Sequence, residues 1–427
     1  MLHTVFRLIR IGLIPVFLLQ FAPGATAGSL TDKLYDDYGI EFSGFAEVRQ
    51  GWRLQEDPFQ KETSISEARL QLAASKDFDV LMINVKGDLL GDAVENQVTG
   101  DLRELNLVFS PFDFMDVKMG RQTLTWGTGD LLFINDLFPK DWKSFFIGRD
   151  DEYLKAPTDA LKIGLFSKIA NLDFIYVPVF NNSVYIDGKR LSYYNGVLGR
   201  TAGNDFVFFD DKPNQIFNDA EYALRLSKNI AGFELALYGY YGFWKTPEGL
   251  DAAALRLIYP RLAVYGASLR APMLGGIAHI EGGYYDSLDD RNGNIATVRN
   301  SEIRFLAGYE RELAANFTAG IQYYLEVMSD HDTYAAAAGT TARDQYRHLI
   351  TLRLTKLMLN QTLRLGLFVY YSPNDADGYL RPKIHYKLTD AWALEVGANI
   401  FFGADRHTFF GQFDKNTNAH AGIRFSF

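Results

Sequence analysis

The chain has 427 residues, of which 22% are charged and 15% aromatic, and it contains no cysteine. The lack of cysteine excludes disulfides, thiolate metal sites and c-type haem attachment. A net charge of −9 gives the chain no overall electrostatic reason to bind nucleic acid. A single compact core stops growing near ~250–300 residues. No Pro/Ser-rich linker divides this longer sequence into domains.

The first 27 residues are typical of a secretory signal peptide. Arg7 and Arg10 form a basic start, an apolar stretch covers 11–22, and Ala25-Thr26-Ala27 supplies the small residues of a cleavage site. We therefore predict Sec-type export and cleavage of residues 1–27, which leaves a single domain over 28–427. The alternative is an uncleaved membrane anchor, although the apolar stretch is short for a stable span.

Beyond residue 27, apolar and polar residues alternate along most of the chain. At the C-terminus the apolar residues hold positions 419, 421, 423, 425 and 427. A period of two places one set of side chains on each face of a β-strand. The pattern predicts eighteen strands, and sixteen remain possible. Pro260 could mark either a bulge in one long strand or a turn between two, and we keep one strand because two would break the parity of the flanking loops. Their expected spans are 40–53, 64–75, 79–90, 101–110, 114–126, 158–168, 172–180, 217–228, 232–244, 252–270, 276–286, 300–310, 316–328, 344–357, 361–372, 379–388, 391–403 and 417–427.

Three features favour a membrane barrel over a soluble sandwich. Many strands exceed the ~5–6 residues of soluble sheets and match the ~9–11 of a tilted transmembrane strand. Charged residues such as Arg304 and Glu395 lie in mid-strand on the polar face. Short connections alternate with long ones. We therefore predict an all-β fold, a closed antiparallel transmembrane β-barrel with short periplasmic turns and long extracellular loops.

In such a barrel the apolar set of side chains faces lipid and the polar set faces a wet lumen. We expect Leu365 and Ile321 to face lipid, and Arg364 and Gln322 to face the lumen. The inward set carries both signs of charge, which suggests weak ion selectivity. The predicted pore-lining residues are Arg49, Arg69, Lys86, Glu104, Lys118, Gln122, Arg225, Glu281, Arg304, Glu326, Arg353, Arg364 and Glu395.

The chain resembles a Gram-negative outer-membrane β-barrel. The likeness rests on the signal sequence, the alternating strands and the terminal Ile423-Arg424-Phe425-Ser426-Phe427, whose last aromatic resembles the signal read by the barrel-insertion machinery. More narrowly, Gly120-Arg121-Gln122-Thr123-Leu124-Thr125-Trp126-Gly127 resembles a strand end found in porin-like families that include the alginate-export type. The alginate-export lumen is rich in arginine, whereas the charges here are mixed, so a polyanionic substrate is not implied.

Two long connections, 126–158 and 181–217, interleave aromatic with charged residues. A loop with so many apolar residues should not extend freely into water. Loop 126–158 should either fold into the barrel, in the way that resembles the constriction loop of general porins, or cap its outer rim. The predicted constriction-loop residues are Arg121, Trp126, Asp130, Asp136, Lys140 and Arg149.

Arg121 has the outward parity of its strand, so we expect it to lie above the bilayer and turn toward the loop. Its planar guanidinium could bind Asp130 or Asp136 through two parallel hydrogen bonds. That contact would pin the loop inside the barrel. The alternative is that Arg121 forms only a rim contact.

These features predict an outer-membrane porin for passive diffusion of small hydrophilic solutes. We expect no enzymatic activity, no cofactor and no metal, because the sequence contains no GxGxxG, Walker A, HExxH or EF-hand pattern. The alternatives are an outer-membrane hydrolase acting at the loop rim, and a non-conducting barrel that serves as a receptor or scaffold. The expected partners are outer-membrane lipid and lipopolysaccharide, the insertion machinery and the solute, but not nucleic acid. A monomer and a homotrimer are both compatible with the sequence.

Deleting Phe427 should impair insertion, because this residue ends the outward set at the predicted barrel seam. The measurement is the yield of heat-modifiable protein in the outer-membrane fraction. A normal yield from the truncated chain would contradict this interpretation of the terminus.

Overall fold

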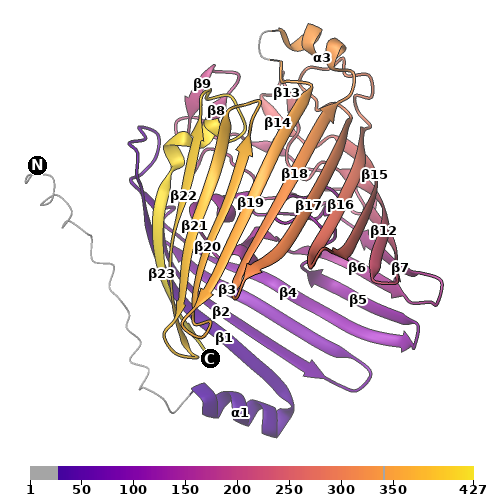
Figure 1. Ribbon diagram of the computed structural model, residues 1–427, viewed down its shortest axis with the longest axis vertical. Coiled ribbons are helices and arrows are strands. Elements are labelled where there is room, and N and C mark those ends of the chain that lie inside the picture. Colours follow the sequence, from indigo (N-terminus) through magenta and orange to yellow (C-terminus); the bar gives the residue numbers. More distant parts are fainter. Residues whose placement is uncertain (1–26, 340–341) are drawn as a thin grey trace, which may run out of the picture.

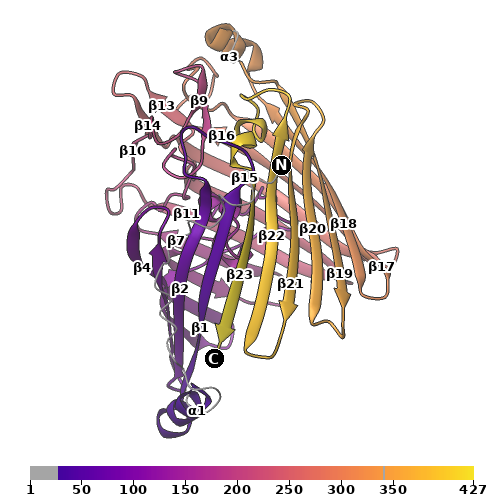
Figure 2. The same ribbon diagram turned by 90° about the vertical axis from the view of Figure 1, so that its left-hand side faces the viewer.

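A computed structural model describes residues 27–339 and 342–427. The predicted signal peptide lies almost wholly outside the described residues, so its cleavage stays a prediction. The described chain forms a closed barrel of eighteen strands. Its long connections gather at one end and its short turns at the other, as Figures 1 and 2 show from two directions. None of the helices in the described ranges is long and apolar enough to cross a membrane.

Eighteen antiparallel strands, not sixteen, make up the wall. Each pairs with two neighbours, and β1 closes the barrel by pairing with β23 from Phe45 opposite Ser426 to Arg53 opposite Asn418. The wall consists of β1 (Ile40–Arg53), β2 (Thr63–Asp77), β3 (Met82–Asp92), β4 (Gln97–Phe112), β5 (Met115–Gln122), β6 (Thr158–Leu165), β7 (Asn171–Val177), β11 (Glu221–Ile230), β12 (Phe233–Phe243), β15 (Arg261–Met273), β16 (Gly276–Ser287), β17 (Glu302–Ala314), β18 (Phe317–Met328), β19 (Tyr346–Met358), β20 (Leu363–Ser372), β21 (Asp377–Lys387), β22 (Trp392–Gly403) and β23 (Asn418–Ser426).

The long connections carry the remaining elements. Small sheets are formed by β8 (Tyr193–Asn195) with β9 (Arg200–Ala202), and by β10 (Asp210–Asp211), β13 (Gly249–Asp251) and β14 (Arg256–Ile258). The helices are α1 (Ala27–Tyr38), α2 (Trp142–Ile147) and α3 (His331–Ala338), with 3₁₀ turns η2 (Asp151–Leu154) and η4 (Gly411–Asn416). Helix α1 precedes β1 at the short-turn end and α3 lies among the loops at the other end (Figure 1).

Several predicted strand boundaries are wrong by three or more residues, and two of these errors affect the long connections. The expected strand 252–270 begins only at Arg261, and part of 252–260 forms β14, which pairs with β13 and β10 in a loop sheet. Pro260 marks this boundary, because proline has no N–H to donate to a ladder and often stands at a strand's start. The expected strand 114–126 ends at Gln122, where the chain leaves the wall.

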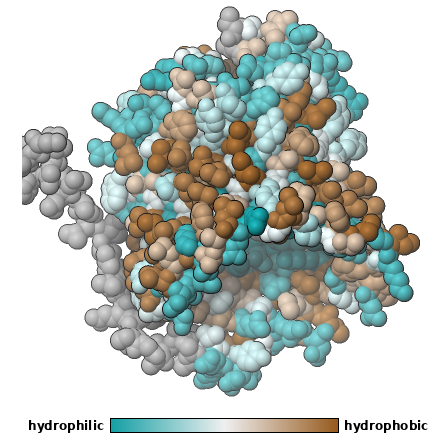
Figure 3. Space-filling view, in the orientation of Figure 1, coloured by the Kyte–Doolittle hydropathy of each residue, from teal (hydrophilic) through white to brown (hydrophobic). Residues whose placement is uncertain are grey.

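The two faces of the wall divide as predicted. Ile321 is 53% exposed on the outer face, whereas its neighbour Gln322 is 4% exposed and contacts residues inside the barrel. Leu365 lies opposite Ile384, which is 47% exposed, and Arg364 lies opposite the inward His385. Figure 3 shows the hydrophobic side chains gathered over the strands and the hydrophilic ones toward the loops. Because lipid can receive the outward side chains, the long chain does not need a large central core.

Ile321→Arg should reduce the folded yield, because an arginine on the lipid face near mid-strand costs about 2–4 kcal/mol. Thr355→Arg is the matched control, since Thr355 lies on the inward face opposite Gly366 and Thr318. The measurement is the free energy of unfolding in lipid vesicles. Equal tolerance of both variants would mean that the register of the wall is shifted by one residue.

Candidate functional site

The connection between β5 and β6, residues 123–157, enters the lumen and crosses it. Its first part reaches the wall at β16, where the Glu281 carboxylate accepts hydrogen bonds from the backbone N–H of Asn135 at 2.8 Å and of Thr128 at 2.6 Å. Asp130 pairs with Arg353 of β19 through both guanidinium nitrogens of one edge. Hydrogen bonds to ionised groups are stronger than those between neutral groups. Thr128, Asp130 and Asn135 are therefore firmly attached to the wall on the far side of the lumen from β5.

Helix α2 lies against a neighbouring part of the wall, two strands beyond β19. Asp141 caps its start by accepting a hydrogen bond from the Ser144 N–H at 2.7 Å, and Gly148 ends it with a φ of 90°. Phe146 packs edge-on against Tyr379 at 5.4 Å and Phe401 at 5.3 Å between ring centroids. Edge-to-face pairs at these distances are favourable, so aromatic packing fixes the helix on β21 and β22.

The returning segment of the loop is held by ion pairs. Asp150 pairs with Arg424 at 3.2 Å and Asp151 pairs with Arg381 at 2.8 Å. Burial opposes ionisation of Asp151, but the charges of Arg381 and Lys383 outweigh it and hold its pKa below the ordinary range. This carboxylate is therefore ionised at neutral pH and stays bound to the wall. The loop lies inside the barrel, and the alternative of a cap on the outer rim is wrong.

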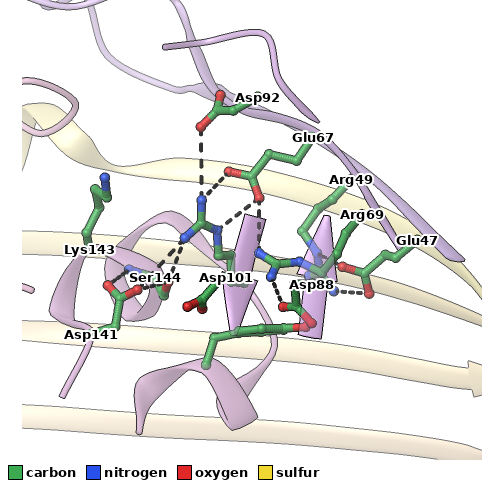
Figure 4. A network of polar contacts seen from close by, with 12 residues as sticks. Glu47, Arg49, Glu67, Arg69, Asp88, Asp92, Asp101, Asp141, Lys143 and Ser144 are labelled. Carbon is green, nitrogen blue, oxygen red and sulfur yellow. Dashed lines mark hydrogen bonds and ion pairs between the residues drawn. The ribbon is translucent and has the colours of Figure 1, made fainter. Parts of the chain in front are cut away.

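Glu67 of β2 connects this loop to the second long connection. Its carboxylate accepts two hydrogen bonds from Arg149, at 2.7 and 2.9 Å, and lies 3.0 Å from Arg190 of the connection between β7 and β11. Arg190 also pairs with Asp92. Figure 4 shows Glu67 with Asp92 on one side and Arg69 on the other. One buried carboxylate thus holds both loops.

Together the two loops fill the long-loop half of the lumen. In each of the eighteen wall strands at least one inward-facing residue is buried, including Ile175, Leu306, Gln322 and Phe368. Inward residues nearer the short turns, such as Arg364, remain exposed. The lumen is therefore open to solvent at its short-turn end and largely filled by loop side chains at its long-loop end.

A cavity of about 450 Å³ remains on the long-loop side of α2. Its walls come mainly from α2, from the segments 131–140, 183–194, 244–248 and 409–413, and from strands β16 to β20. We call this space the vestibule. Several loops and the barrel wall converge on it.

The predicted pore-lining residues lie on the inward face, and most of them hold other residues in place. Arg49 donates hydrogen bonds to the Gly148 carbonyl of the loop and to the Glu395 carboxylate of β22. The remaining pairs are Arg69 with Asp88, Lys86 with Glu104, Arg225 with Glu234, Arg304 with Glu302, and Glu326 with Arg299. Gln122 bonds to the Ala160 carbonyl, and Lys118 lies opposite Lys162.

The predicted contact of Arg121 is wrong. Its guanidinium binds Asp159 of β6 at 2.7 and 2.9 Å on the outer face, and does not reach Asp130 or Asp136. Strand pairing explains this, because Arg121 and Asp159 stand directly opposite in the ladder and the regular parity is kept through Gly120. Arg121 therefore neutralises a charge in the wall and pins no loop.

The other predicted loop residues lie inside the barrel. Trp126 packs against Phe138 at 5.1 Å between ring centroids. Lys140 is buried and pairs with Asp136 at 2.9 Å. Burial lowers the pKa of Lys140, and the Asp136 carboxylate opposes that effect.

Sequence reasoning did not single out Glu67, Arg190 and Tyr379 as loop anchors. Glu67 and Tyr379 lie on predicted strands, and their position on the inward face could have marked them as candidates for contact with a loop inside the barrel. Arg190 lies in a long connection with no periodic pattern, and nothing in the sequence indicated its partner.

No family model and no curated protein matches the chain. Among solved structures it is similar to Acinetobacter baumannii OccAB3, with a TM-score of 0.58 and 10% identity over 91% of this chain and 99% of that one. It is also similar to Pseudomonas aeruginosa OccD3 (OpdP), with a TM-score of 0.53 and 10% identity over 91% of both chains. At this identity the comparisons establish a shared fold. The predicted likeness to outer-membrane barrels is therefore confirmed for the fold.

Glu67→Gln should loosen both loops, because it removes the charge that Arg149 and Arg190 share in a buried site. Breaking such a pair costs about 3–5 kcal/mol. The measurements are the free energy of unfolding and the rate of tryptic cleavage within 181–217.

Glu234→Gln is the matched control. Glu234 pairs with Arg225, its side chain is 45% exposed, and it lies on β12 near a short turn. An exposed pair contributes about 0–1 kcal/mol. If Glu67→Gln behaves like this control, the two loops are held by other contacts.

Proposed function

We propose that this chain forms a channel in the bacterial outer membrane for passive diffusion of small hydrophilic solutes. The observation that carries the proposal is a closed eighteen-strand barrel whose own loop crosses its lumen. Closure provides a transmembrane wall without free edges. An outward apolar face fits lipid, and an inward face rich in charged residues fits a polar path.

The two loops that fill the long-loop half of the lumen, which we call the loop layer, favour a narrow, selective channel over a wide one. Eighteen strands can enclose an aqueous lumen, but here the long-loop half is occupied by packed side chains. The loops are attached by side-chain pairs such as Asp151 with Arg381, and not by strand pairing with the wall. Such an attachment can give way locally while the barrel stays closed.

The mixed charges in the lumen favour a hydrophilic solute. Arginines and lysines on the wall face loop carboxylates, as Arg424 and Lys383 face Asp150 and Asp151. Paired charges of both signs provide hydrogen-bonding groups along the path with a small net field. We infer that the barrel conducts and does not catalyse.

Single-channel conductance in planar bilayers tests the proposal. The intact protein should conduct ions, and deletion of 131–147 should raise the conductance severalfold and admit larger solutes. Deletion of α3 is the control, because this helix lies among the outermost loops (Figure 1). It should leave the conductance unchanged.

A protein that inserts but conducts no ions, with or without the deletion, would contradict the channel. Lipid or peptide turnover by the same preparation would then favour the hydrolase, and its absence would favour a receptor or scaffold.

A further inference from the structure

The vestibule differs from the rest of the lumen in its composition. Nearly half of the residues that line it are aromatic, including Trp142 and Phe145 of α2 and Tyr193 of the second loop. On the wall side the lining changes to Arg299, Glu326 and Arg347. The cavity therefore has an aromatic side and a hydrogen-bonding side.

The charges on the hydrogen-bonding side are already matched. Arg299 contacts Glu248, Glu302 and Glu326 at 2.7 to 3.1 Å. The remaining cations of the lining also have carboxylates within ion-pair distance: Arg304 with Glu302, Lys140 with Asp136, Lys245 with Glu221, and Arg347 with Asp375 at 3.8 Å. A charged ligand would lose its hydration without gaining an unused counter-charge.

A neutral aromatic ligand is also a poor match. It would pack on Trp142 and Phe145, but it would exclude solvent from the Arg299 and Glu326 side without offering these groups any hydrogen bond in return. A buried polar group left unpaired costs about 1–3 kcal/mol. A hydroxyl both donates and accepts, so it can bond to guanidinium and carboxylate groups alike.

We propose that the vestibule is a binding site for a small neutral carbohydrate. The C–H face of the sugar ring lies on the aromatic side, with Trp142 as the main platform. Its hydroxyls bond to the paired Arg299 and Glu326 and to Arg347. The Arg347 Nε and Nη2 atoms have no hydrogen-bond partner within the described chain, and the ring of Phe409 lies 4.2 Å from its guanidinium carbon. A cavity of about 450 Å³ has room for one or two sugar rings. This inference rests on the proposed function, because it assigns the solute class of that channel.

Tryptophan fluorescence of the full-length barrel in detergent micelles tests the site without requiring conduction. The probes are glucose and maltose, gluconate as the charged analogue of glucose, and benzoate as an aromatic acid. We expect a saturable change with the neutral sugars and none with gluconate or benzoate. Arg347→Ala should weaken sugar binding about tenfold, which corresponds to one lost charged hydrogen bond.

Trp142→Ala should abolish most of the fluorescence change, while Trp392→Ala is the control, because Trp392 is 42% exposed near a short turn. Heat modifiability on a gel shows whether each variant is folded. Tighter binding of gluconate or benzoate than of glucose, or sugar binding unaffected by Arg347→Ala, would overturn the proposal. Sugar binding without conductance would refute the channel and keep the site, whereas conductance without sugar binding would refute only the site.

Discussion

The fold depends on one constraint, which is that lipid offers no hydrogen-bond partner to a peptide group. Every backbone N–H and C=O in the membrane must therefore pair within the chain. The pairing of β1 with β23 meets this requirement, since it converts an open sheet with two free edges into a closed wall. The alternating side chains follow from closure, because each strand then separates lipid from the lumen. The 400 residues or so that follow the predicted signal peptide can thus form one domain without a large central core.

A closed wall of this size leaves a space that the chain itself partly fills. The connection 123–157 leaves the wall at Gln122 and returns at Thr158, so two neighbouring strands are short and the chain between them is free to turn inward. Inside, aromatic side chains of α2 bury apolar area against Tyr379 and Phe401. Ion pairs at Glu67, Arg353 and Arg381 then define the position of the loop. The combination gives a rigid barrel with a loop layer held by local contacts, which suits a selective path better than an open pore.

Strand-level features could be predicted from the sequence because they repeat. The alternation around Ile321 and Gln322 identifies the two faces of the strand without knowledge of any contact. Counting the alternating segments along the chain then gives eighteen strands. The boundary at Arg261 was missed, since 252–259 is apolar apart from Arg256 and therefore looks like a continuation of the strand, and Pro260 was compatible with a bulge. Loop contacts have no such repeat. Arg121 illustrates the limit, because its partner Asp159 is decided by the register of β5 against β6, whereas the sequence pointed to the loop carboxylates Asp130 and Asp136. Arg190 and Glu67 meet only through the path of two long loops, and periodicity holds no information about that path.

The central claim is that residues 123–157 occupy the lumen, and cross-linking tests it most directly because the chain has no native cysteine. A Cβ built on Gly283 of β16 would lie 3.7 Å from Asn135 Oδ1, with Gly283 on the inward face. Cysteines introduced at 135 and 283 should therefore form a disulfide in the folded barrel, and the single-channel conductance should stay at its native value. The measurement is the shift in gel mobility with and without reductant, together with thiol labelling of the folded protein. Two freely labelled thiols and no cross-link would contradict the account and would place the loop outside the barrel.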